Sequence, residues 1–329
     1  MPPPLVVCCD LSRLNMERPA GAAVYARFVL DILSRSGEVV QVGRERMAQA
    51  DVILSLDGRF RPGRGQRTVT AVLDLGHLLE RRGYGLAEWI GQNWRVASAV
   101  RRSDHLLAPS EAIAFGLDRY LRTPAGRVTV LPPQARACFR RPRREQVAEV
   151  RKSLGLPDRY FVFVGSRARR KNLGLLDAAW RAAAGTLGPD VGLVMAGPGG
   201  GPAVVAGARD LGYVPLDHLP ALIAGAVAWL NPSLYEGSAI GAMEAMACGT
   251  PPLVAGTGAQ ARAVGTAGLV LDPHDPEEWT RAVIAIATSG QLRARLSAAS
   301  LATAAEIRAS APRPEALRTV LLGAAGAAR

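Results

Sequence analysis

The sequence predicts an α/β protein of two domains, each with a parallel sheet covered by helices. Three observations indicate this class. The chain has 329 residues, which exceeds the roughly 250–300 residues at which single cores tend to split. Short apolar runs that are typical of strands alternate with helical patterns along the chain. Apolar residues make up 49% of the sequence and charged residues 21%, so each half has enough apolar side chains for its own core.

The first series of elements ends at Pro132 and Pro133. A loop through Gly21 leads into a helical pattern at 22–33, and the apolar runs predict strands at 5–9, 52–56, 68–73, 105–108 and 128–131. Residues 138–152 are dense in Arg, Pro and Glu and read as a linker that leads into a short helix. We therefore expect domains at 1–150 and 151–329, with the last helix returning to the first domain.

A second series follows the linker. Strands are predicted at 160–164, 193–196, 227–231, 253–255 and 268–271, helices at 172–184, 240–247 and 276–288, and a Gly/Pro turn at 197–202. Gly249 and Pro251 stop the helix at 240–247. No internal repeat interrupts this alternation.

Composition excludes several classes of protein. No run of 18 apolar residues is present, so we expect no membrane-spanning helix. The start Met1-Pro2-Pro3-Pro4 lacks the basic and apolar regions of a secretory signal, so we expect a cytoplasmic protein. The cysteines have no C-x-x-C spacing, which argues against a zinc site or a disulfide framework; we expect small core residues at Cys8, Cys9, Cys138 and Cys248.

The charge is uneven along the chain. The net charge is +12, yet residues 1–144 hold 23 basic and 13 acidic residues, against 17 and 15 in residues 145–329. Solvated surface arginines are the simplest explanation. A positive field also suits an anionic acceptor or a peripheral contact at the inner membrane face. Nucleic acid is not expected as a partner, because no DNA- or RNA-binding motif accompanies the charge.

The segment 231–251 carries the strongest functional pattern. A strand ends at Asn231, a loop of small residues follows Glu236, and a helix then carries Glu244. Free N–H groups at a helix start attract phosphate, and ligands of open α/β sheets bind at the carboxyl ends of strands. Carboxylates accept hydrogen bonds from the vicinal hydroxyls of a sugar. The alternative is an amphipathic helix with a surface glutamate.

These residues resemble a known family. Glu236 and Glu244 form a Glu-x7-Glu motif, preceded by Pro232-Ser-Leu-Tyr and followed by Ala-Met-Ala-Cys-Gly-Thr-Pro251. Phe163-Val-Gly-Ser166 and Arg170-Lys171-Asn172 precede them in the expected order. The pattern is similar to the retaining glycosyltransferases of family 4, which have the GT-B fold of two Rossmann-like domains with parallel sheets that face a central cleft. The resemblance covers nearly all of the second half.

The resemblance implies transfer of a hexose from a nucleotide diphosphate sugar with retention of the anomeric configuration, as in polysaccharide biosynthesis. It implies no cofactor and no metal, since a cation near the diphosphate takes the place of a metal. Catalytic roles fall to Glu236, which contacts the hexose, and to Lys171, which stabilises the leaving diphosphate together with an arginine. Arg167 is the expected partner, and Arg170, next to Lys171, is the alternative. Glu244 holds the ribose. The further donor-binding residues are Gly165, Ser166, Arg170, Tyr213, Val214, Gly237, Ser238, Ala239 and Ile240.

Departures from the family pattern concern the acceptor side. The glycine-rich loop reads Gly21-Ala22-Ala23, and Leu73 stands where the family has a histidine before Asp74. His77 follows three residues later, as an ordinary loop histidine or a substitute. Ser110 reads first as a helix cap and second as an acceptor contact. The expected acceptor is a sugar, a lipid-linked glycan or a small molecule.

Residues 78–102 combine aromatic and basic side chains. The helical spacing of Trp89, Ile90, Trp94, Ala97 and Val100 favours packing on the sheet, and the arginines nearby also suit a membrane interface.

One alternative of another class stays open. The missing histidine and the altered glycine loop also fit a catalytically degenerate GT-B protein that binds nucleotide or sugar or serves as a partner subunit. The order of the motifs disfavours a sugar-nucleotide epimerase.

Overall fold

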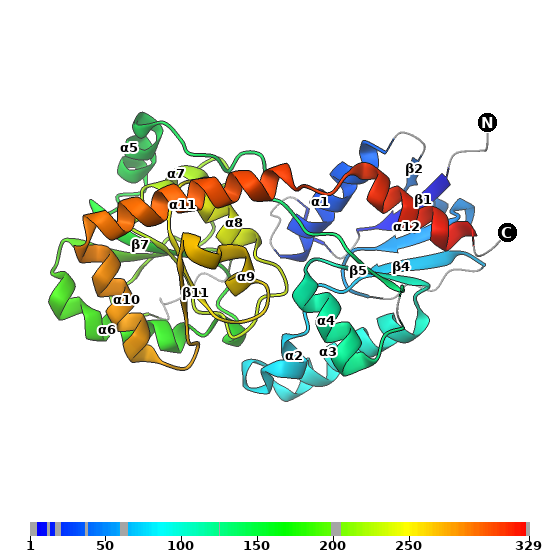
Figure 1. Cartoon of the computed structure of the whole chain (residues 1–329), viewed down its shortest axis with the longest axis horizontal. Helices are drawn as coiled ribbons and strands as arrows, with labels where there is room; N and C mark the ends of the chain where they lie inside the picture. Colours follow the sequence, from blue (N-terminus) through cyan, green and yellow to red (C-terminus); the bar gives the residue numbers. More distant parts are fainter. Residues whose placement is uncertain are drawn as a thin grey trace. The chain divides into compact units, whose positions relative to one another are not determined.

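The computed structural model describes residues 5–11, 14–16, 21–36, 39–59, 65–124, 126–198 and 205–326. Two compact units divide the chain: Met1–Pro133 with Ala311–Arg329, and Gln134–Ser310 (Figure 1). Residues 134–150, which we expected in the first domain, belong to the second unit. The reason is that helix α5 (Arg144–Ser153) packs against α7 (Leu219–Ala224) and buries Val150 there.

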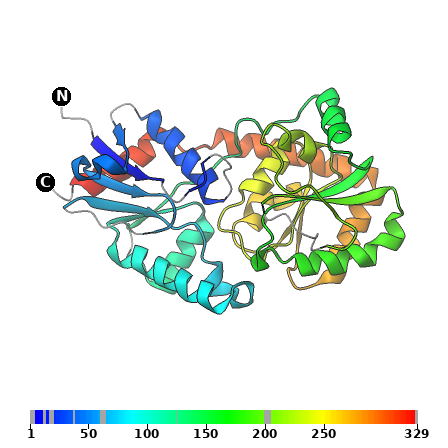
Figure 2. The ribbon, with the colours of Figure 1, turned by 180° about the vertical axis from the view of Figure 1, so that it is seen from behind.

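The first unit contains a parallel sheet in the order β2-β1-β3-β4-β5-β6. Its strands are β1 Leu5–Asp10, β2 Val39–Val42, β3 Val52–Ser55, β4 Arg67–Ala71, β5 His105–Ala108 and β6 Val128–Val130. Its helices are α1 Ala22–Ser34, α2 Gly76–Leu79, α3 Leu86–Arg102, α4 Glu111–Leu121 and α12 Pro314–Gly326. Figures 1 and 2 show α1 and α12 on one face of this sheet and α3 and α4 on the other.

The C-terminal helix α12 completes the core of the first unit. Leu317 and Leu321 are buried in one cluster with Val7 and Val29, and α12 contacts α1, β3 and β4. Tyr25 in the same cluster donates its hydroxyl to the carbonyl of Leu131 at 3.2 Å. The first unit is therefore built from both ends of the chain.

The second unit contains another parallel sheet, in the order β12-β11-β10-β7-β8-β9. Its strands are β7 Arg159–Val164, β8 Val191–Ala196, β9 Arg209–Asp210, β10 Trp229–Asn231, β11 Pro252–Ala255 and β12 Leu269–Leu271. Beside α5 and α7 its helices are α6 Leu173–Leu187, α8 Ile240–Ala247, α9 Gln260–Val264, α10 Pro276–Thr288 and α11 Gly290–Ala309.

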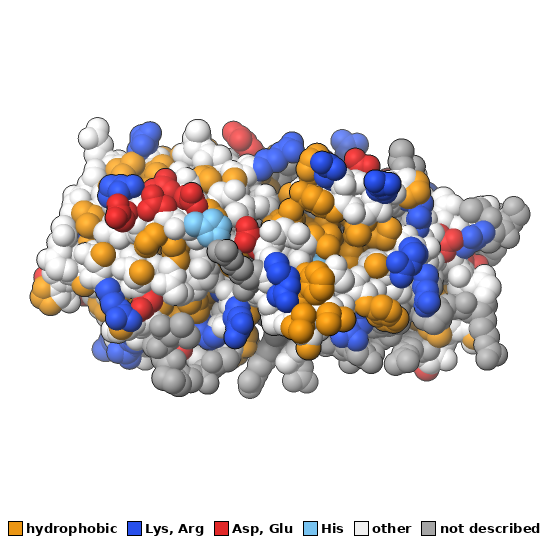
Figure 3. All heavy atoms as spheres, turned by 90° about the horizontal axis from the view of Figure 1, so that it is seen from below, with side chains coloured by type: hydrophobic (Ala, Val, Ile, Leu, Met, Phe, Trp, Pro, Cys, Tyr) orange, Lys and Arg blue, Asp and Glu red, His pale blue; other side chains and the backbone are white. Residues whose placement is uncertain are grey.

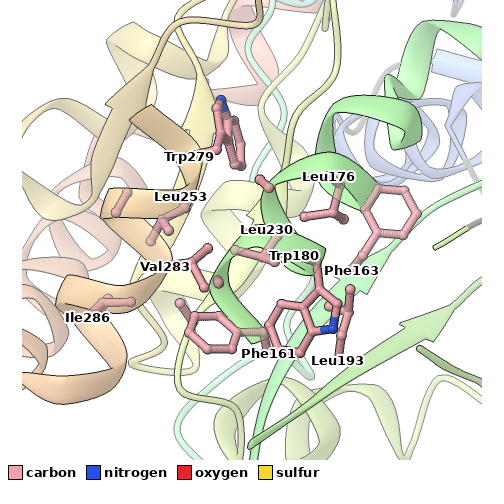
Figure 4. Close-up of a cluster of buried hydrophobic side chains, with 14 of the residues drawn as sticks. Phe161, Phe163, Leu176, Trp180, Leu193, Leu230, Leu253, Trp279, Val283 and Ile286 are labelled. Atoms are coloured by element: carbon pink, nitrogen blue, oxygen red, sulfur yellow. The ribbon is translucent and has the colours of Figure 1, made fainter. Parts of the chain in front are cut away.

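Each face of the second sheet carries its own core, because successive side chains of a strand point to opposite faces. Phe161 and Phe163 join the cluster under α6 and α10, with Trp180 and Trp279 (Figure 4). Tyr160 and Val162 join the cluster on the opposite face. Burial on both faces explains why β7 reads as a continuous apolar run.

The order of the second sheet reverses between β7 and β10. Strands β7, β8 and β9 extend to one side, and β10, β11 and β12 extend to the other. Loops that leave such a reversal diverge and form a crevice at the carboxyl ends of the strands. The segments after β7 and after β10 contain Lys171 and Glu236.

The predicted fold class, two Rossmann-like α/β domains with parallel sheets, is confirmed. The edge strands β2 and β9 escaped prediction, because β2 buries only Val42 and β9 has two residues. Cys8, Cys9 and Cys248 are buried as expected, whereas Cys138 is exposed. Most of the predicted turn at 197–202 lies outside the described residues, as does Met1–Pro4. Of the helices described here, none has the length and apolar character needed to cross a bilayer.

Candidate functional site

Lys171 and Glu236 meet at the reversal of the second sheet. The ammonium Nζ of Lys171 lies 2.5 Å from Oε1 of Glu236, and a guanidinium nitrogen of Arg170 lies 3.7 Å from the same oxygen. Arg170 and Lys171 belong to a 3-10 turn, Arg169–Lys171, directly before α6. The N–H of Leu234 donates to the carbonyl of Arg170 at 2.9 Å. The loops after β7 and β10 are thus joined through backbone and side chains.

A polar network from the end of β10 and from the start of α9 holds Glu236 in place. Asn231, the last residue of β10, donates to Oε1 of Gln260 at 2.6 Å and lies 3.5 Å from Oε1 of Glu236. Ser233 donates to Oδ1 of Asn231 at 2.5 Å. The carbonyl of Glu236 accepts from the N–H of Ala259 at 2.9 Å. Asn231, Ser233 and Gln260 were not predicted as site residues.

The charge of Glu236 is stabilised despite burial. Burial alone would raise its pKa, but Lys171 and then Arg170 outweigh that effect and hold the pKa of Glu236 below its usual value. Two cations and one carboxylate leave this cluster with a net positive charge, which is suited to an anionic ligand.

Glu244 lies on α8, eight residues after Glu236, and is buried with 5% of its surface exposed. Arg136 binds its carboxylate with two hydrogen bonds, Nε to Oε1 at 2.6 Å and a terminal nitrogen to Oε2 at 3.0 Å. Burial raises the pKa of Glu244, and the bonds from Arg136 oppose that rise. Arg136 was missed in the sequence, because it lies 108 residues away from Glu244 and belongs to no recognisable motif.

Arg167 does not join Lys171. Its guanidinium donates to the carbonyl of Gly165 at 2.8 Å and to Oδ1 of Asp210 at 2.7 Å, and it lies over the ring of Phe163. The expectation that Arg167 accompanies Lys171 is corrected: Arg170 is the arginine beside Glu236. Neighbouring residues of the 3-10 turn place their cations on the same carboxylate, although adjacent helical side chains usually diverge.

The remaining predicted donor residues lie around the same strand ends. Gly165 and Ser166 follow β7 and are half-buried, and a Cβ at Gly165 would lie 3.7 Å from Cε of Lys171. Tyr213 is exposed and Val214 is buried, after β9. Helix α8 follows Gly237, Ser238 and Ala239 and begins at Ile240; its cap residue, Ala239, makes no side-chain cap. The first N–H groups of α8 therefore have no capping side chain.

Three predicted acceptor-side positions follow carboxyl ends of strands in the first unit. Gly21, with φ +52°, precedes α1, which starts at Ala22 and follows β1. Asp74 follows β4 and accepts from the N–H of Gly76 at 2.6 Å. Ser110 follows β5 and accepts from the N–H of Ile113 at 3.3 Å, which confirms its reading as a helix cap.

His77 is enclosed rather than free in a loop. It belongs to α2, is 2% exposed, and packs edge-on against Tyr84. Among the described residues none forms a hydrogen bond with its Nε2, and its carbonyl accepts from the indole of Trp89 at 2.9 Å. Burial, and then Arg95, lower the pKa of His77 to about 4. A neutral imidazole is therefore held inside the first unit at pH 7.

The interpretation of Trp89, Ile90, Trp94, Ala97 and Val100 as sheet-packing residues is wrong for two of them. Val100 is buried and Ala97 is half-buried. Trp89 is half-buried, but Ile90 and Trp94 are 55% and 67% exposed, and Leu86 on the same stripe is 64% exposed. Residues four apart lie on one helical face, so α3 presents an apolar stripe to solvent. Figure 3 shows apolar side chains gathered on this face with basic side chains at their margin.

A cavity of about 390 Å³ in the second unit lies away from these residues. It opens between α5, α7 and α11, and Arg141, Arg144, Arg151 and Arg293 are among its lining side chains. None of the predicted site residues lines it.

Part of the second unit resembles a known family. Residues 158–289 match the family model of group 1 glycosyl transferases. The D-inositol 3-phosphate glycosyltransferase of Salinispora arenicola is 34% identical over 241 residues, which cover 64% of this chain and 52% of the relative. O-antigen chain mannosyltransferase B of Escherichia coli is 46% identical over 67 residues, 20% of this chain and 18% of the relative. The chain spans about half the length of the inositol phosphate glycosyltransferases that it matches.

Solved structures extend the likeness to both units. WaaG, a glycosyltransferase involved in lipopolysaccharide biosynthesis, matches with a TM-score of 0.76 and 16% identity over 97% of this chain and all of WaaG. Anabaena Alr3699/HepE, solved in complex with UDP-glucose, matches with a TM-score of 0.70 and 15% identity over 98% of this chain and 99% of HepE. These structures share with this chain the fold of two Rossmann-like domains.

Proposed function

We propose that the chain is a retaining hexosyltransferase of family 4 that moves a hexose from a nucleotide diphosphate sugar to an acceptor hydroxyl. The observation that carries this proposal is the meeting of Lys171, Arg170 and Glu236 at the reversal of the second sheet. The likeness to HepE, solved with UDP-glucose, supports a nucleotide-sugar donor.

In the proposed donor site, each part of the nucleotide sugar is bound by a different set of residues. Glu244 accepts the ribose hydroxyls, and Tyr213 and Val214 hold the base. The backbone N–H groups from Gly237 to Ile240 and the half-buried Gly165 and Ser166 lie against the diphosphate. Glu236 contacts the hexose, which requires Lys171 to turn from the carboxylate toward the phosphates as the donor enters. The net positive charge of the cluster favours that exchange.

The proposed chemistry is heterolysis of the bond between the sugar and the diphosphate. Negative charge develops on the departing diphosphate, and Arg170 and Lys171, once Lys171 has turned toward the phosphates, stabilise that charge. The acceptor hydroxyl then bonds to the anomeric carbon from the face that the diphosphate leaves, and its proton passes to a departing phosphate oxygen. Because two cations are available, we propose that transfer needs no metal ion.

The donor assignment is tested with UDP-, GDP- and ADP-sugars by nucleotide release and thermal shift, beside Glu244→Ala. We expect one nucleotide series to stabilise the wild type and to bind at least about tenfold more weakly to the variant, since hydrogen bonds to a charged group contribute about 1.5–3 kcal/mol. Equal thermal shifts of wild type and Glu244→Ala with every nucleotide would refute the ribose assignment.

Metal independence has a separate test. Activity that disappears with EDTA and returns with Mg²⁺ would refute metal independence.

The stereochemistry has its own test. With the preferred donor and an acceptor, proton NMR of the first product formed should show the anomeric configuration of the donor. An inverted product would contradict the retaining mechanism.

Nothing in the comparisons favours the alternative of a degenerate binding protein, and sugar transfer with any acceptor would exclude it.

The acceptor is proposed to be a sugar, a lipid-linked glycan or a small molecule that approaches the first unit near Gly21, Asp74 and Ser110. These residues follow carboxyl ends of β1, β4 and β5, the edge at which open α/β sheets bind ligands. His77 is not proposed to contact the acceptor, because it is enclosed.

We further propose that the α3 stripe rests on an anionic membrane surface. Leu86, Ile90 and Trp94 supply the apolar face, and Arg101 and Arg102 at the end of the same helix are exposed and cationic. This combination suits the boundary between acyl chains and anionic headgroups.

Sedimentation with lipid vesicles tests the membrane contact. We expect the protein to bind phosphatidylcholine–phosphatidylglycerol vesicles, to bind pure phosphatidylcholine less, and to lose binding in Ile90→Glu. Leu322→Glu on α12 is the control, because Leu322 is also an exposed leucine of the first unit. Equal binding of both variants would refute the proposal, and a dimer that Ile90→Glu dissociates would assign the stripe to a second copy instead.

A further inference from the structure

Arg136 binds both oxygens of Glu244 with the geometry of a fork. Nε and a terminal nitrogen each donate to a different carboxylate oxygen, at 2.6 and 3.0 Å. Two parallel charge-assisted bonds fix the position of a carboxylate as well as its charge.

The second unit itself fixes Arg136. The carbonyl of Arg136 accepts from the N–H of Phe139 at 2.8 Å, and the guanidinium lies 4.7 Å from the centre of the Phe139 ring. Phe139 is fully buried in the core of the unit, and Arg308 donates to its carbonyl at 3.2 Å. Arg136 is therefore part of a packed turn, not a side chain of a loose linker.

A carboxylate as buried as Glu244 needs such a partner. Removing one member of a buried ion pair leaves an uncompensated charge, and the acid then takes up a proton. Desolvation raises the pKa of the thiols of Cys138 and Cys248, and the charge of Glu244 adds to that rise, so both are neutral at pH 7 and neither offsets the charge of Glu244. Among the residues that the structure describes, Arg136 is the cation bonded to Glu244.

We propose that Arg136 is a positioning residue of the donor site, which orients the Glu244 carboxylate for a hydroxyl of the donor ribose. This inference rests on the proposed function. A carboxylate has about four lone-pair sites. The fork occupies one on each oxygen, and the backbone N–H of Arg136 also bonds to the carboxylate, so about one site stays open for a ribose hydroxyl. Arg136 and the ribose can therefore bind the carboxylate together.

The test measures binding of UDP, GDP and ADP to Arg136→Met and Arg136→Lys by calorimetry. For the nucleotide that wild type binds most tightly, we expect Arg136→Met to raise Kd about tenfold or more at pH 7, because the carboxylate loses the charge-assisted fork that orients it. Lysine keeps the charge and loses the fork, so Arg136→Lys should recover part of the affinity. Arg141→Met, an exposed arginine nearby, is the matched control and should bind as wild type.

Two further measurements separate positioning from a merely structural role. First, the 2′,3′-dideoxy nucleotide and pyrophosphate lack the vicinal hydroxyls, so wild type and Arg136→Met should bind each of them alike. Second, the loss in Arg136→Met should grow as pH falls from 8.5 to 6, because burial without the guanidinium favours the protonated form of Glu244.

Three outcomes would overturn the inference: tighter nucleotide binding by Arg136→Met, which would make Arg136 an obstruction; an equal loss for the dideoxy nucleotide; or a loss that does not change with pH. If Arg136→Met does not fold, the same comparisons are made with Arg136→Lys. Failure of the proposed function is distinguishable, because wild type would then bind no nucleotide or Glu244→Ala would bind it unchanged.

Discussion

Lys171 and Glu236 can both stay charged while largely buried, because each charge stabilises the other. Their contact is 2.5 Å, and both side chains are largely buried. The cost of removing a charge from water is repaid only with a close partner, so a single deletion is more harmful than a double one.

A double-mutant cycle on this pair measures that dependence. We expect Lys171→Met and Glu236→Gln each to lower the free energy of unfolding by about 1–3 kcal/mol, and the double variant to lose less than the sum. Urea unfolding of the four proteins gives the coupling energy. Additive losses would mean that the two charges do not stabilise each other.

His77 predicts a pH-dependent stability. Its pKa is lowered from 6.5 to about 4 in the folded chain. Between these values the unfolded chain binds a proton at His77 that the folded chain does not bind, so stability falls as pH falls through that window. We expect His77→Gln to reduce the loss of unfolding free energy between pH 7 and pH 4.5 by about 2 kcal/mol, as measured by urea unfolding. The same substitution at the exposed His274 should leave the loss unchanged.

At the scale of elements, the loop after β10 depends on a glycine that belongs to another loop. Gly258 has φ +58°, and a Cβ there would collide with the carbonyl oxygen of Glu236. Its neighbour Ala259 donates to that same carbonyl. The two backbones approach so closely that only glycine fits between them.

Substitution of Gly258 should therefore move Glu236. We expect Gly258→Ala to lower the unfolding free energy by about 2–4 kcal/mol, from the unfavourable φ and the collision together, and to weaken nucleotide binding. Gly207→Ala is the control: its φ is +75° with open space around it, so only about 1–2 kcal/mol should be lost. Similar losses in both variants would show that the contact with Glu236 carries no energy.

The first and last residues of helices and strands could be predicted where the sequence contains capping residues, prolines or glycines at those positions. The observed helix Pro276–Thr288 matches its predicted range, because Asp275 caps it and proline occupies its first turn. The helix at Ile240–Ala247 and the strand at His105–Ala108 also match. The edge strand β2 was missed, since an edge strand with one buried residue has little apolar pattern.

Side-chain partners were less predictable than elements. Lys171 and Glu236 were recognised from motifs, and parallel strand ends bring them together. Arg167 was predicted beside Lys171, but Arg170 lies there instead, because Arg167 is bonded to Asp210. Asp210 belongs to a strand of two residues, which leaves no recognisable pattern in the sequence. The pair of Arg136 and Glu244 depends on how the turn Arg136–Phe139 packs, and no local pattern records that packing.

At the scale of the whole molecule, the two units differ in how the chain builds them. The second unit is one continuous segment, Gln134–Ser310, whereas the first needs residues from both ends of the chain. The core of the first unit is therefore not complete until α12 has been made, although the strands of its sheet come first.

This connectivity predicts a selective effect of α12 on the first unit. Leu321 is fully buried against the first sheet, whereas Leu322, next to it on the same helix, is 41% exposed. Leu321→Ala should lower the stability of the first unit by about 2–5 kcal/mol, the usual range for a buried leucine, while Leu322→Ala should change it by about 0.5 kcal/mol or less. Hydrogen exchange locates the loss: amides of β1, β3 and β4 should exchange faster in Leu321→Ala, and those of β7, β8 and β10 should keep their wild-type rates. Faster exchange throughout both sheets would mean that the two units unfold together, and the connectivity would then have no separate consequence for stability.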